Sequence, residues 1–194
     1  TQIFFFFFIL IYEIFDEENR TPIKLADLPP HVYQASIAIE DKNFYRHFGF
    51  DFSGILRALI TNLRDNQSVG GSTITQQLVK NALLTNEKSL QRKAKEAILA
   101  ILTEIIYSKD DILEMYLNYI SYGGTSVGIE AASQRFFNKS AVQLTASEAA
   151  RLAAVLPNPL RYRADQPSGY VRKRQRWIEQ QMRQLGGVAY LERL

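Results

Sequence analysis

Two adjacent carboxylates, Glu40 and Asp41, follow the apolar stretch Ile37-Ala-Ile39. An apolar setting penalises the charged form of a carboxyl group and raises its pKa. A carboxylate with a raised pKa is suited to accept a proton from a weak nucleophile at neutral pH. The pair therefore predicts a general base, and the alternative is a helix end with two solvated acids. We expect His47, six residues on, to be a structural hydrogen-bonding residue rather than a catalyst.

A glycine pair, Gly70-Gly71, precedes Ser72 and Thr73, either of which can cap a helix. Free backbone amides and the positive end of a helix dipole make such a start a candidate anion site. The Gly-Lys-Ser/Thr ending of a nucleotide-binding loop is missing, and Ser72 does not lie in a Gly-x-Ser-x-Gly elbow. An ordinary turn with an N-cap is the alternative interpretation.

A cationic group follows, in which Arg92 and Glu96 are four residues apart on one predicted helix face. With Lys93 and Lys95 nearby, this helix start could offer several cations and one carboxylate to a phosphorylated ligand. A solvated face with an ion pair worth about 0.3–0.5 kcal/mol is the alternative. Further along, Tyr116 and Asn118 could line a groove for a sugar.

Helices must position these groups, because apolar residues recur with helical period after residue 29. Ser108 with Asp111, and Thr145 with Glu148, have the spacing of capping boxes. Helices are predicted from Pro30 to about His47, from Asp51 to 65, from Ser72 or Thr73 to Leu84, from Ser89 onward, and from about Ser168 to Leu185.

Two further patterns concern the core and the start of the chain. Residues 10–15 and 21–25, which flank the polar residues 16–20, predict two strands joined by a loop. The sequence as a whole therefore predicts a mainly α fold with a small β edge. In the helix after Ser89, six apolar residues are expected to face the core: Ile98, Leu99, Ile101, Leu102, Ile105 and Ile106.

Composition excludes several classes of function. The 194 residues suit one sizeable domain, and with no cysteine and only two histidines the chain has no disulfide, no thiol nucleophile and no zinc site with the usual Cys/His ligands. The net charge is +3, but six basic residues and one acidic residue lie between Arg161 and Trp177. That patch suits an anionic partner, namely a phospholipid surface, a nucleic acid or a diphosphate, and a solvated helix face is the alternative interpretation.

The run from Ile3 to Tyr12 is wholly apolar or aromatic. It is shorter than the roughly 20 residues that span a bilayer, and it lacks the basic start and cleavage site of a signal peptide. It is interpreted as the end of a truncated anchor, a lipid-facing edge or a buried strand.

Five ordered motifs connect these observations. They are Glu40-Asp41-x-x-Phe44-x-x-His47-x-Gly49; Gly70-Gly71-Ser72-Thr73-Ile74-Thr75-Gln76-Gln77 with Lys80-Asn81; Arg92-Lys93-x-x-Glu96; Glu114-x-Tyr116-Leu117-Asn118; and Thr145-x-x-Glu148-Ala149-x-x-Leu152-Ala153, ending at Pro157-Asn158-Pro159. Over roughly residues 20 to 180 the chain resembles the peptidoglycan glycosyltransferases (glycosyltransferase family 51), which occur as a domain of class A penicillin-binding proteins and as monofunctional enzymes.

The resemblance implies a lysozyme-like, mainly α fold with a large head lobe, a small jaw lobe and a short β-hairpin near the N-terminus. It divides the chain into a membrane-proximal apolar segment at 1–12, read as a candidate anchor remnant, and a glycosyltransferase domain at 13–194. It also implies an activity: polymerisation of lipid II by inverting transfer of the growing, lipid-diphosphate-linked chain to the 4-OH of an incoming lipid II, which forms β1,4 linkages.

By motif position, Glu40 is the implied general base, and Glu96 is the second catalytic acid, which helps to hold the donor diphosphate or its metal. The implied substrate-binding residues are Asp41, Ser72, Thr73, Gln76, Gln77, Lys80, Asn81, Arg92, Lys93, Lys95, Tyr116 and Asn118. A divalent cation, Mg²⁺ or Mn²⁺, fits at the diphosphate, with Glu96 as its candidate protein ligand, and no organic cofactor is implied.

The implied partners are lipid II, the growing lipid-linked glycan, the membrane surface and the inhibitor moenomycin, at the periplasmic face of the bacterial inner membrane. The Ser-x-x-Lys and Lys-Thr-Gly strings of a transpeptidase are absent, so we expect an isolated domain, with a transpeptidase domain downstream in the full-length protein, or a monofunctional enzyme. Two rival hypotheses stay open, a lysozyme-like peptidoglycan hydrolase or lytic transglycosylase, and a module that binds nucleic acid or membrane. We expect no nucleic-acid partner.

Overall fold

The computed structural model describes residues 22–52, 54, 71–84, 89–124 and 126–186, and these residues are mainly helical. The α-helices are α2 (Pro30–Glu40), α4 (Ile74–Leu83), α5 (Leu90–Ile106), α6 (Lys109–Tyr119), α7 (Ile129–Phe137), α8 (Ala146–Val155) and α9 (Gly169–Gln184). Three short 3₁₀ turns, η1 (Leu25–Asp27), η2 (Phe44–Arg46) and η3 (Ala141–Gln143), connect them. The prediction of a mainly α fold is confirmed, and none of the described helices is long and apolar enough to cross a membrane.

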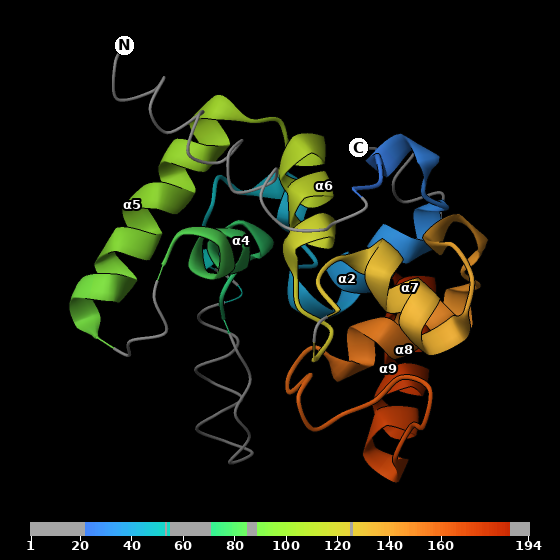
Figure 1. Cartoon of the computed structure of the whole chain (residues 1–194). Helices are drawn as coiled ribbons and strands as arrows, with labels where there is room; N and C mark the ends of the chain where they lie inside the picture. The colour runs from blue at the N-terminus through green and yellow to red at the C-terminus, as the bar shows by residue number, and fades with distance from the viewer. Residues whose placement is uncertain (1–21, 53, 55–70, 85–88, 125, 187–194) are drawn as a thin grey trace.

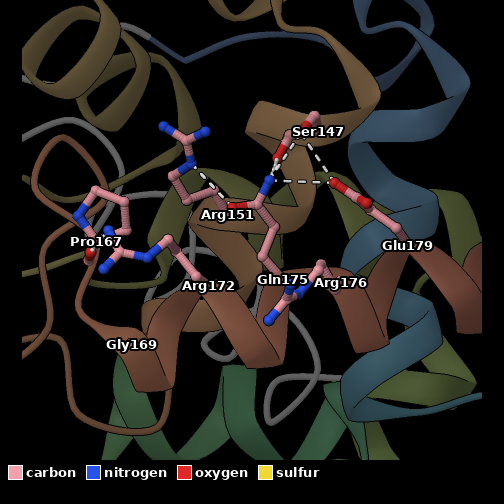
Figure 2. A pocket seen from close by; sticks show the side chains of 8 residues that line it. All are labelled: Ser147, Arg151, Pro167, Gly169, Arg172, Gln175, Arg176 and Glu179. Atoms are coloured by element: carbon pink, nitrogen blue, oxygen red, sulfur yellow. Dashed lines mark hydrogen bonds between the residues drawn. The ribbon is translucent and has the colours of Figure 1, made fainter.

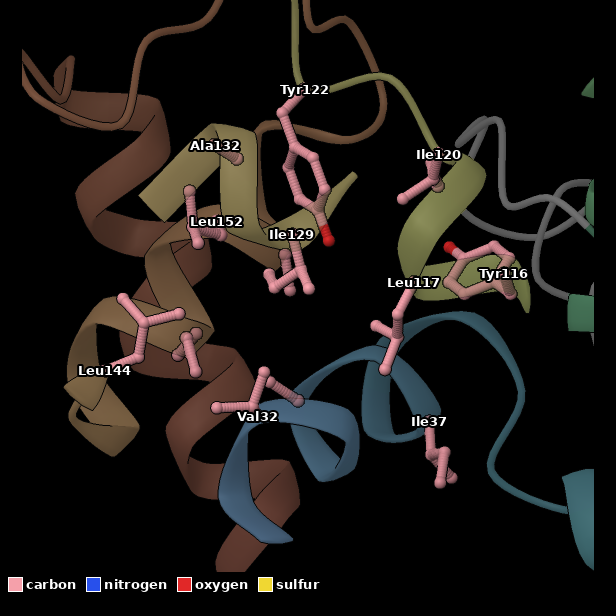
Figure 3. Packing of buried hydrophobic residues seen from close by; sticks show 14 of the residues in the cluster. Val32, Ile37, Tyr116, Leu117, Ile120, Tyr122, Ile129, Ala132, Leu144 and Leu152 are labelled. Carbon is pink, nitrogen blue, oxygen red and sulfur yellow. The ribbon is translucent and has the colours of Figure 1, made fainter. Parts of the chain in front are cut away.

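The helices form two groups that meet at α2 and α6 (Figure 1). In one group α2 packs against α8 and α9, and in the other α4 packs against α5 and α6. Buried apolar side chains join α2, α6, α7 and α8 into one core, in which Val32, Leu117, Ile129 and Leu152 lie together (Figure 3). Helix α4, which carries the second predicted motif, therefore packs between α5 and α6.

Local capping sets where most of these helices begin. Thr73, Ser108 and Thr145 each form the capping box with the residue three positions on. The hydroxyl oxygens of Ser89 and Ser168 accept hydrogen bonds from backbone amides of the first turns of α5 and α9. The predicted helix starts at these five positions are confirmed, because each N-cap side chain satisfies an amide that has no partner inside the helix.

Helix α2 is shorter than the predicted helix, which continued to about His47. It ends at Glu40, because the backbone of Asp41 leaves the helical region with φ −158° and ψ 78°, and a separate 3₁₀ turn covers Phe44–Arg46. The proline at the start of α2 is Pro30, where the missing N–H needs no partner. The end of α2 places the Glu40 side chain at a helix terminus rather than on a helix face.

The predicted N-terminal hairpin is not observed. Its first strand and its loop lie outside the described residues, and residues 22–24 form no strand before η1 begins at Leu25. The side chain of Asn118 instead pairs with both backbone groups of Ile23, since its Oδ1 accepts from Ile23 N at 3.0 Å and its Nδ2 donates to Ile23 O at 2.8 Å. An amide side chain thus takes the place of a neighbouring strand. Leu25 N similarly donates to Glu114 Oε2 at 2.7 Å.

The helix predicted to begin at Asp51 lies almost wholly outside the described residues. Its start is visible, because Gly54 N donates to Asp51 Oδ1 at 2.9 Å, as a capping aspartate requires.

Helix α5 presents the opposite face from the one predicted. Ile98, Ile101 and Ile105 were expected in the core, but their exposed fractions are 60%, 40% and 57%. Leu99, Leu102 and Ile106 are only partly buried. The residues of α5 that are buried are Glu96, Ala100, Thr103 and Glu104.

The buried carboxylate of Glu104, which is paired with groups of two other helices, explains why the polar face of α5 points inward. Glu104 Oε1 accepts a hydrogen bond from Thr75 Oγ1 at 2.6 Å and forms an ion pair with Lys109 Nζ at 2.7 Å. The Lys109 ammonium also lies 4.5 Å from the ring centre of Phe44. A buried carboxylate is tolerated when it is paired and hydrogen-bonded, so these contacts hold the polar face of α5 against α4 and α6 and leave its isoleucines outside.

Candidate active site

Glu40, the last residue of α2, is partly exposed and lies against α4. Gln77 Nε2, in the second turn of α4, donates to Glu40 Oε2 at 2.5 Å. Burial raises the pKa of the Glu40 carboxyl above its ordinary value, and the nearby charge of Asp41 adds to the rise. The Gln77 hydrogen bond and the charges of Arg174 and Lys80 act in the opposite direction. Burial dominates, so Glu40 has the property of a proton acceptor that the sequence predicted.

Asp41 has a different role from its neighbour. It is buried, with 5% of its surface exposed, and its carboxylate accepts from His47 Nε2 at 2.8 and 2.9 Å and from Ile74 N at 3.1 Å. Ile74 is the first residue of α4, so Asp41 joins the end of α2 to the start of α4. Both oxygens are occupied by protein donors, and Asp41 therefore positions the two helices. His47 is a hydrogen-bonding partner here, as expected.

Thr73 and Gln76, two of the predicted substrate-binding residues, are buried in the capping box of α4. Gln76 N donates to Thr73 Oγ1 at 3.2 Å, and Thr73 N donates to Gln76 Oε1 at 3.1 Å. Thr73 Oγ1 also donates to the carbonyl of Gly49 at 2.8 Å, which ties the first two motifs together. These side chains hold the start of α4 in place, whereas Ser72 and Gln77 stay partly exposed on either side of them.

Glu96 and the first turns of α5 form a second charged group. Only 1% of Glu96 is exposed, and its carboxylate is paired with Arg92 Nη1 at 3.0 Å and with the ammonium of Lys93. Lys93 Nζ also reaches Ser72 Oγ at 3.4 Å, just before α4. The Arg92 Nε atom is buried without a hydrogen-bond partner among the described residues. The structure thus brings Ser72, Arg92, Lys93 and Glu96 together.

The remaining predicted site residues divide into exposed and buried sets. Lys80, Asn81 and Lys95 are exposed on α4 and α5. Tyr116 and Asn118 are buried in α6, and the Asn118 amide is fully used by Ile23 and the carbonyl of Glu114. Neither of the two lines an exposed surface.

The Tyr116 hydroxyl is buried and has no hydrogen-bond partner among the described residues. Burial raises the pKa of Tyr116 well above its ordinary value, and interactions with the ionised forms of Glu40, Tyr122 and Asp41 raise it further. The Tyr122 ring points its hydroxyl end into the space between α6 and α7 (Figure 3). Both tyrosine hydroxyl groups near Glu40 are therefore neutral at physiological pH.

Arg174 lies near the Glu40 site, where sequence reasoning did not place it. It was grouped with the basic residues between Arg161 and Trp177 as a contact for an anionic partner, but its charge acts on Glu40 across the packed helices α2 and α9. Its Nε atom is buried without a partner among the described residues. No local pattern signals this contact, because more than 130 residues separate the two side chains.

The described residues do not fit a metal ion held by the protein. They contain no group of three or more Asp, Glu, His or Cys side chains that could bind one. Both oxygens of Glu96, the predicted metal ligand, accept from Arg92 and Lys93. A carboxylate between two cations is a poor additional ligand, and a divalent cation bound through the donor diphosphate stays a prediction.

Taken together, the geometry offers one carboxylate with a raised pKa and two nearby cationic groups. Glu40 lies on the α2 side of α4, with Lys80 and Arg174 close enough to act on it, and the Arg92, Lys93 and Glu96 group lies on the α5 side. Such an arrangement can deprotonate a hydroxyl group and bind an anion next to it.

Comparison with known proteins agrees with this chemistry. A family model described as Transglycosylase matches residues 9–183. Proteins named Biosynthetic peptidoglycan transglycosylase from Salmonella paratyphi B, Salmonella enteritidis and Salmonella typhi are each 49% identical to this chain over 172 residues. Each of these alignments covers 88% of this chain and 71% of the relative.

Proposed function

The chain belongs to the transglycosylase family, and from this premise we propose that it is a peptidoglycan glycosyltransferase that polymerises lipid II into glycan strands. The name of its relatives and the match of the family model over residues 9–183 support this function. The alternative of a peptidoglycan hydrolase or lytic transglycosylase is not favoured, because the relatives are named as biosynthetic.

Glu40 is the general base in this proposal, and its position at the end of α2 against Gln77 of α4, where burial raises the pKa of its carboxyl group, supports this role. The 4-OH of the incoming lipid II is a weak nucleophile that must lose its proton as it attacks. Gln77 holds one carboxylate oxygen, Oε2, and this hydrogen bond leaves Oε1 to accept the proton. The acceptor oxygen then bonds to the anomeric carbon of the growing chain, and the bond from that carbon to the lipid diphosphate breaks. Attack from the back of an α-linked donor inverts the centre and gives a β1,4 linkage.

The leaving diphosphate takes the electron pair of the broken bond and is already a stable anion. It therefore needs cations and amide dipoles more than it needs a proton donor. Positive charge comes from Lys80 on α4 and from Arg92, Lys93 and Lys95 on α5. Ser72, just before α4, lies 3.4 Å from Lys93 Nζ. In this scheme Glu96 positions Arg92 and Lys93, because its buried carboxylate is paired with both.

The exposed isoleucines of α5 support a membrane-proximal position for the enzyme. Ile98, Ile101 and Ile105 lie three and four residues apart and form one apolar stripe. A lipid-linked substrate has to be met at the bilayer surface, and we propose that this stripe faces the periplasmic side of the inner membrane. We also propose that the helices form a lysozyme-like arrangement with a large head lobe and a small jaw lobe.

The stripe can be tested with vesicles. Replacing Ile98 and Ile105 with glutamine should reduce cosedimentation with phospholipid vesicles without lowering the thermal midpoint, since both side chains are exposed. The matched control is Val142→Gln, another exposed apolar side chain, located in η3. Equal vesicle binding by all three proteins would contradict the membrane-facing role of α5.

The proposed activity is tested by incubating the chain with labelled lipid II, with and without moenomycin, and sizing the products. We expect long glycan strands that moenomycin suppresses. Purified peptidoglycan serves as the second substrate. Clearing of that material without any lipid-linked donor, and no strand synthesis, would replace the proposal with the hydrolase alternative.

A further inference from the structure

A polar pocket lies between α8 and α9, away from the groups described above (Figure 2). Its volume is about 460 Å³, within the range of small-molecule sites. Three arginines line it, Arg151 from α8 and Arg172 and Arg176 from α9, together with Ser147, Gln175 and Glu179. Positive charge therefore exceeds negative charge in this pocket.

The three guanidinium groups have most of their donors unused. None of them forms an ion pair with any carboxylate of the described residues. Arg151 donates from Nε to Gln175 Oε1 at 3.1 Å, and Arg172 donates from Nη1 to the carbonyl of Pro167 at 2.7 Å. Each arginine carries five N–H donors in a fixed fork, so several remain for a ligand.

The opposite side of the pocket is a hydrogen-bonded group of neutral and acidic side chains. Ser147 Oγ and Gln175 Nε2 both donate to Glu179 Oε1, at 2.9 and 3.1 Å, and Gln175 Nε2 also donates to Ser147 Oγ at 2.7 Å (Figure 2). This network fixes Gln175, which in turn holds Arg151. The second carboxylate oxygen of Glu179, Oε2, can accept a hydrogen bond from a ligand.

The pocket is separate from the Glu40 site. Successive residues of an α-helix are rotated by roughly 100°, so Arg174, two positions from both Arg172 and Arg176, points roughly 200° away from each of them. Arg174, whose charge acts on Glu40, lies on one flank of α9. Arg172 and Arg176 lie on the other flank, beside α8. A ligand in this pocket would not contact the proposed base.

We propose that this pocket binds the phosphate group of a hydroxylated phosphate ester, of which glycerol phosphate is the simplest example. Guanidinium groups recognise phosphate oxygens in pairs, and the non-bridging oxygens, three in a monoester and two in a diester, can each accept from more than one arginine. The free oxygen of Glu179 accepts a hydrogen bond from a hydroxyl of the same ligand. The ester is presented either by a soluble molecule or by the headgroup of an anionic phospholipid.

The test measures binding of glycerol phosphate to the whole chain by calorimetry at constant ionic strength. The pocket variant replaces Arg172 and Arg176 with glutamine, and the matched control replaces Lys173 and Arg183 with glutamine. The control removes the same charge from exposed positions of the same helix that do not line the pocket. We expect about tenfold weaker binding by the pocket variant and a change of less than about twofold in the control.

Vesicles that contain phosphatidylglycerol distinguish the two sources of the ester. Loss of vesicle cosedimentation by the pocket variant, but not by the control, assigns the site to a lipid headgroup. Loss of glycerol phosphate binding alone assigns it to a soluble ester. The proposal is overturned when the unmodified chain binds neither probe, or when the control loses binding as much as the pocket variant does.

Discussion

The hydrogen bond from Gln77 to Glu40 should set the pH at which the enzyme gains activity. Replacing Gln77 with methionine keeps the length of the side chain but removes the donor that holds Glu40 Oε2 at 2.5 Å. That donor stabilises the ionised carboxylate, so its loss must raise the pKa of Glu40 further. A hydrogen bond to a charged group contributes about 1.5–3 kcal/mol, and 1.36 kcal/mol corresponds to about one pKa unit. Because Glu40 is partly exposed and water can replace part of the bond, we expect a shift near the lower end, about one unit.

The assay is the pH dependence of kcat/KM for lipid II polymerisation, whose acidic limb reports the ionisation of the base in the free enzyme. The Gln77→Met variant should show that limb about one pH unit higher than the unmodified chain. Gln143→Met is the control, because Gln143 is exposed in η3 and far from α4 in sequence. A limb that stays within about 0.3 units of the original, or that moves down, would refute the proposed role of this hydrogen bond.

Three further changes test the surroundings of the base. Asp41→Asn should lower the free energy of unfolding by about 2 kcal/mol in urea titrations, because a neutral amide offers one acceptor oxygen instead of two and loses the charge that strengthens the hydrogen bonds from His47 and Ile74. Tyr116→Phe should leave the thermal midpoint unchanged or slightly higher, since the hydroxyl it removes is buried without a partner among the described residues. Glu40→Gln should raise the thermal midpoint at pH 7 but not at pH 4. The folded protein holds the Glu40 proton more tightly than the unfolded chain, whose carboxyl has the ordinary pKa of 4.5. Ionisation of Glu40 therefore destabilises the folded state fully above the raised pKa and not at all below pH 4.5.

Sequence reasoning succeeded where the signal is local. The capping boxes at Thr73, Ser108 and Thr145 were predictable because the cap and its partner are three residues apart and satisfy the same backbone amides. The acidic pair at the end of α2 was predictable for a similar reason, since an apolar run precedes it directly.

The orientation of α5 could not be predicted from its own sequence. The pattern of isoleucines suggests that they face the core, but the side chains that fix the helix are Thr75 and Lys109, which pair with the buried Glu104 from two other helices. The structural contacts of Asp41 were unpredictable for a related reason, because its partner Ile74 N is a backbone group 33 residues away, and its role in substrate binding stays a prediction. Contacts of this kind depend on tertiary packing and leave no periodic signal.

The most direct measurement of the central claim is the rate of strand synthesis from lipid II by Glu40→Gln, with Asp27→Asn as the control that removes an exposed acid elsewhere. General-base catalysis contributes about 10²–10⁴-fold to such reactions. We therefore predict a loss of at least about 100-fold for Glu40→Gln, with an unchanged far-UV spectrum, and a near-normal rate for Asp27→Asn. Near-normal strand synthesis by a folded Glu40→Gln variant would contradict the assignment of Glu40 as the base.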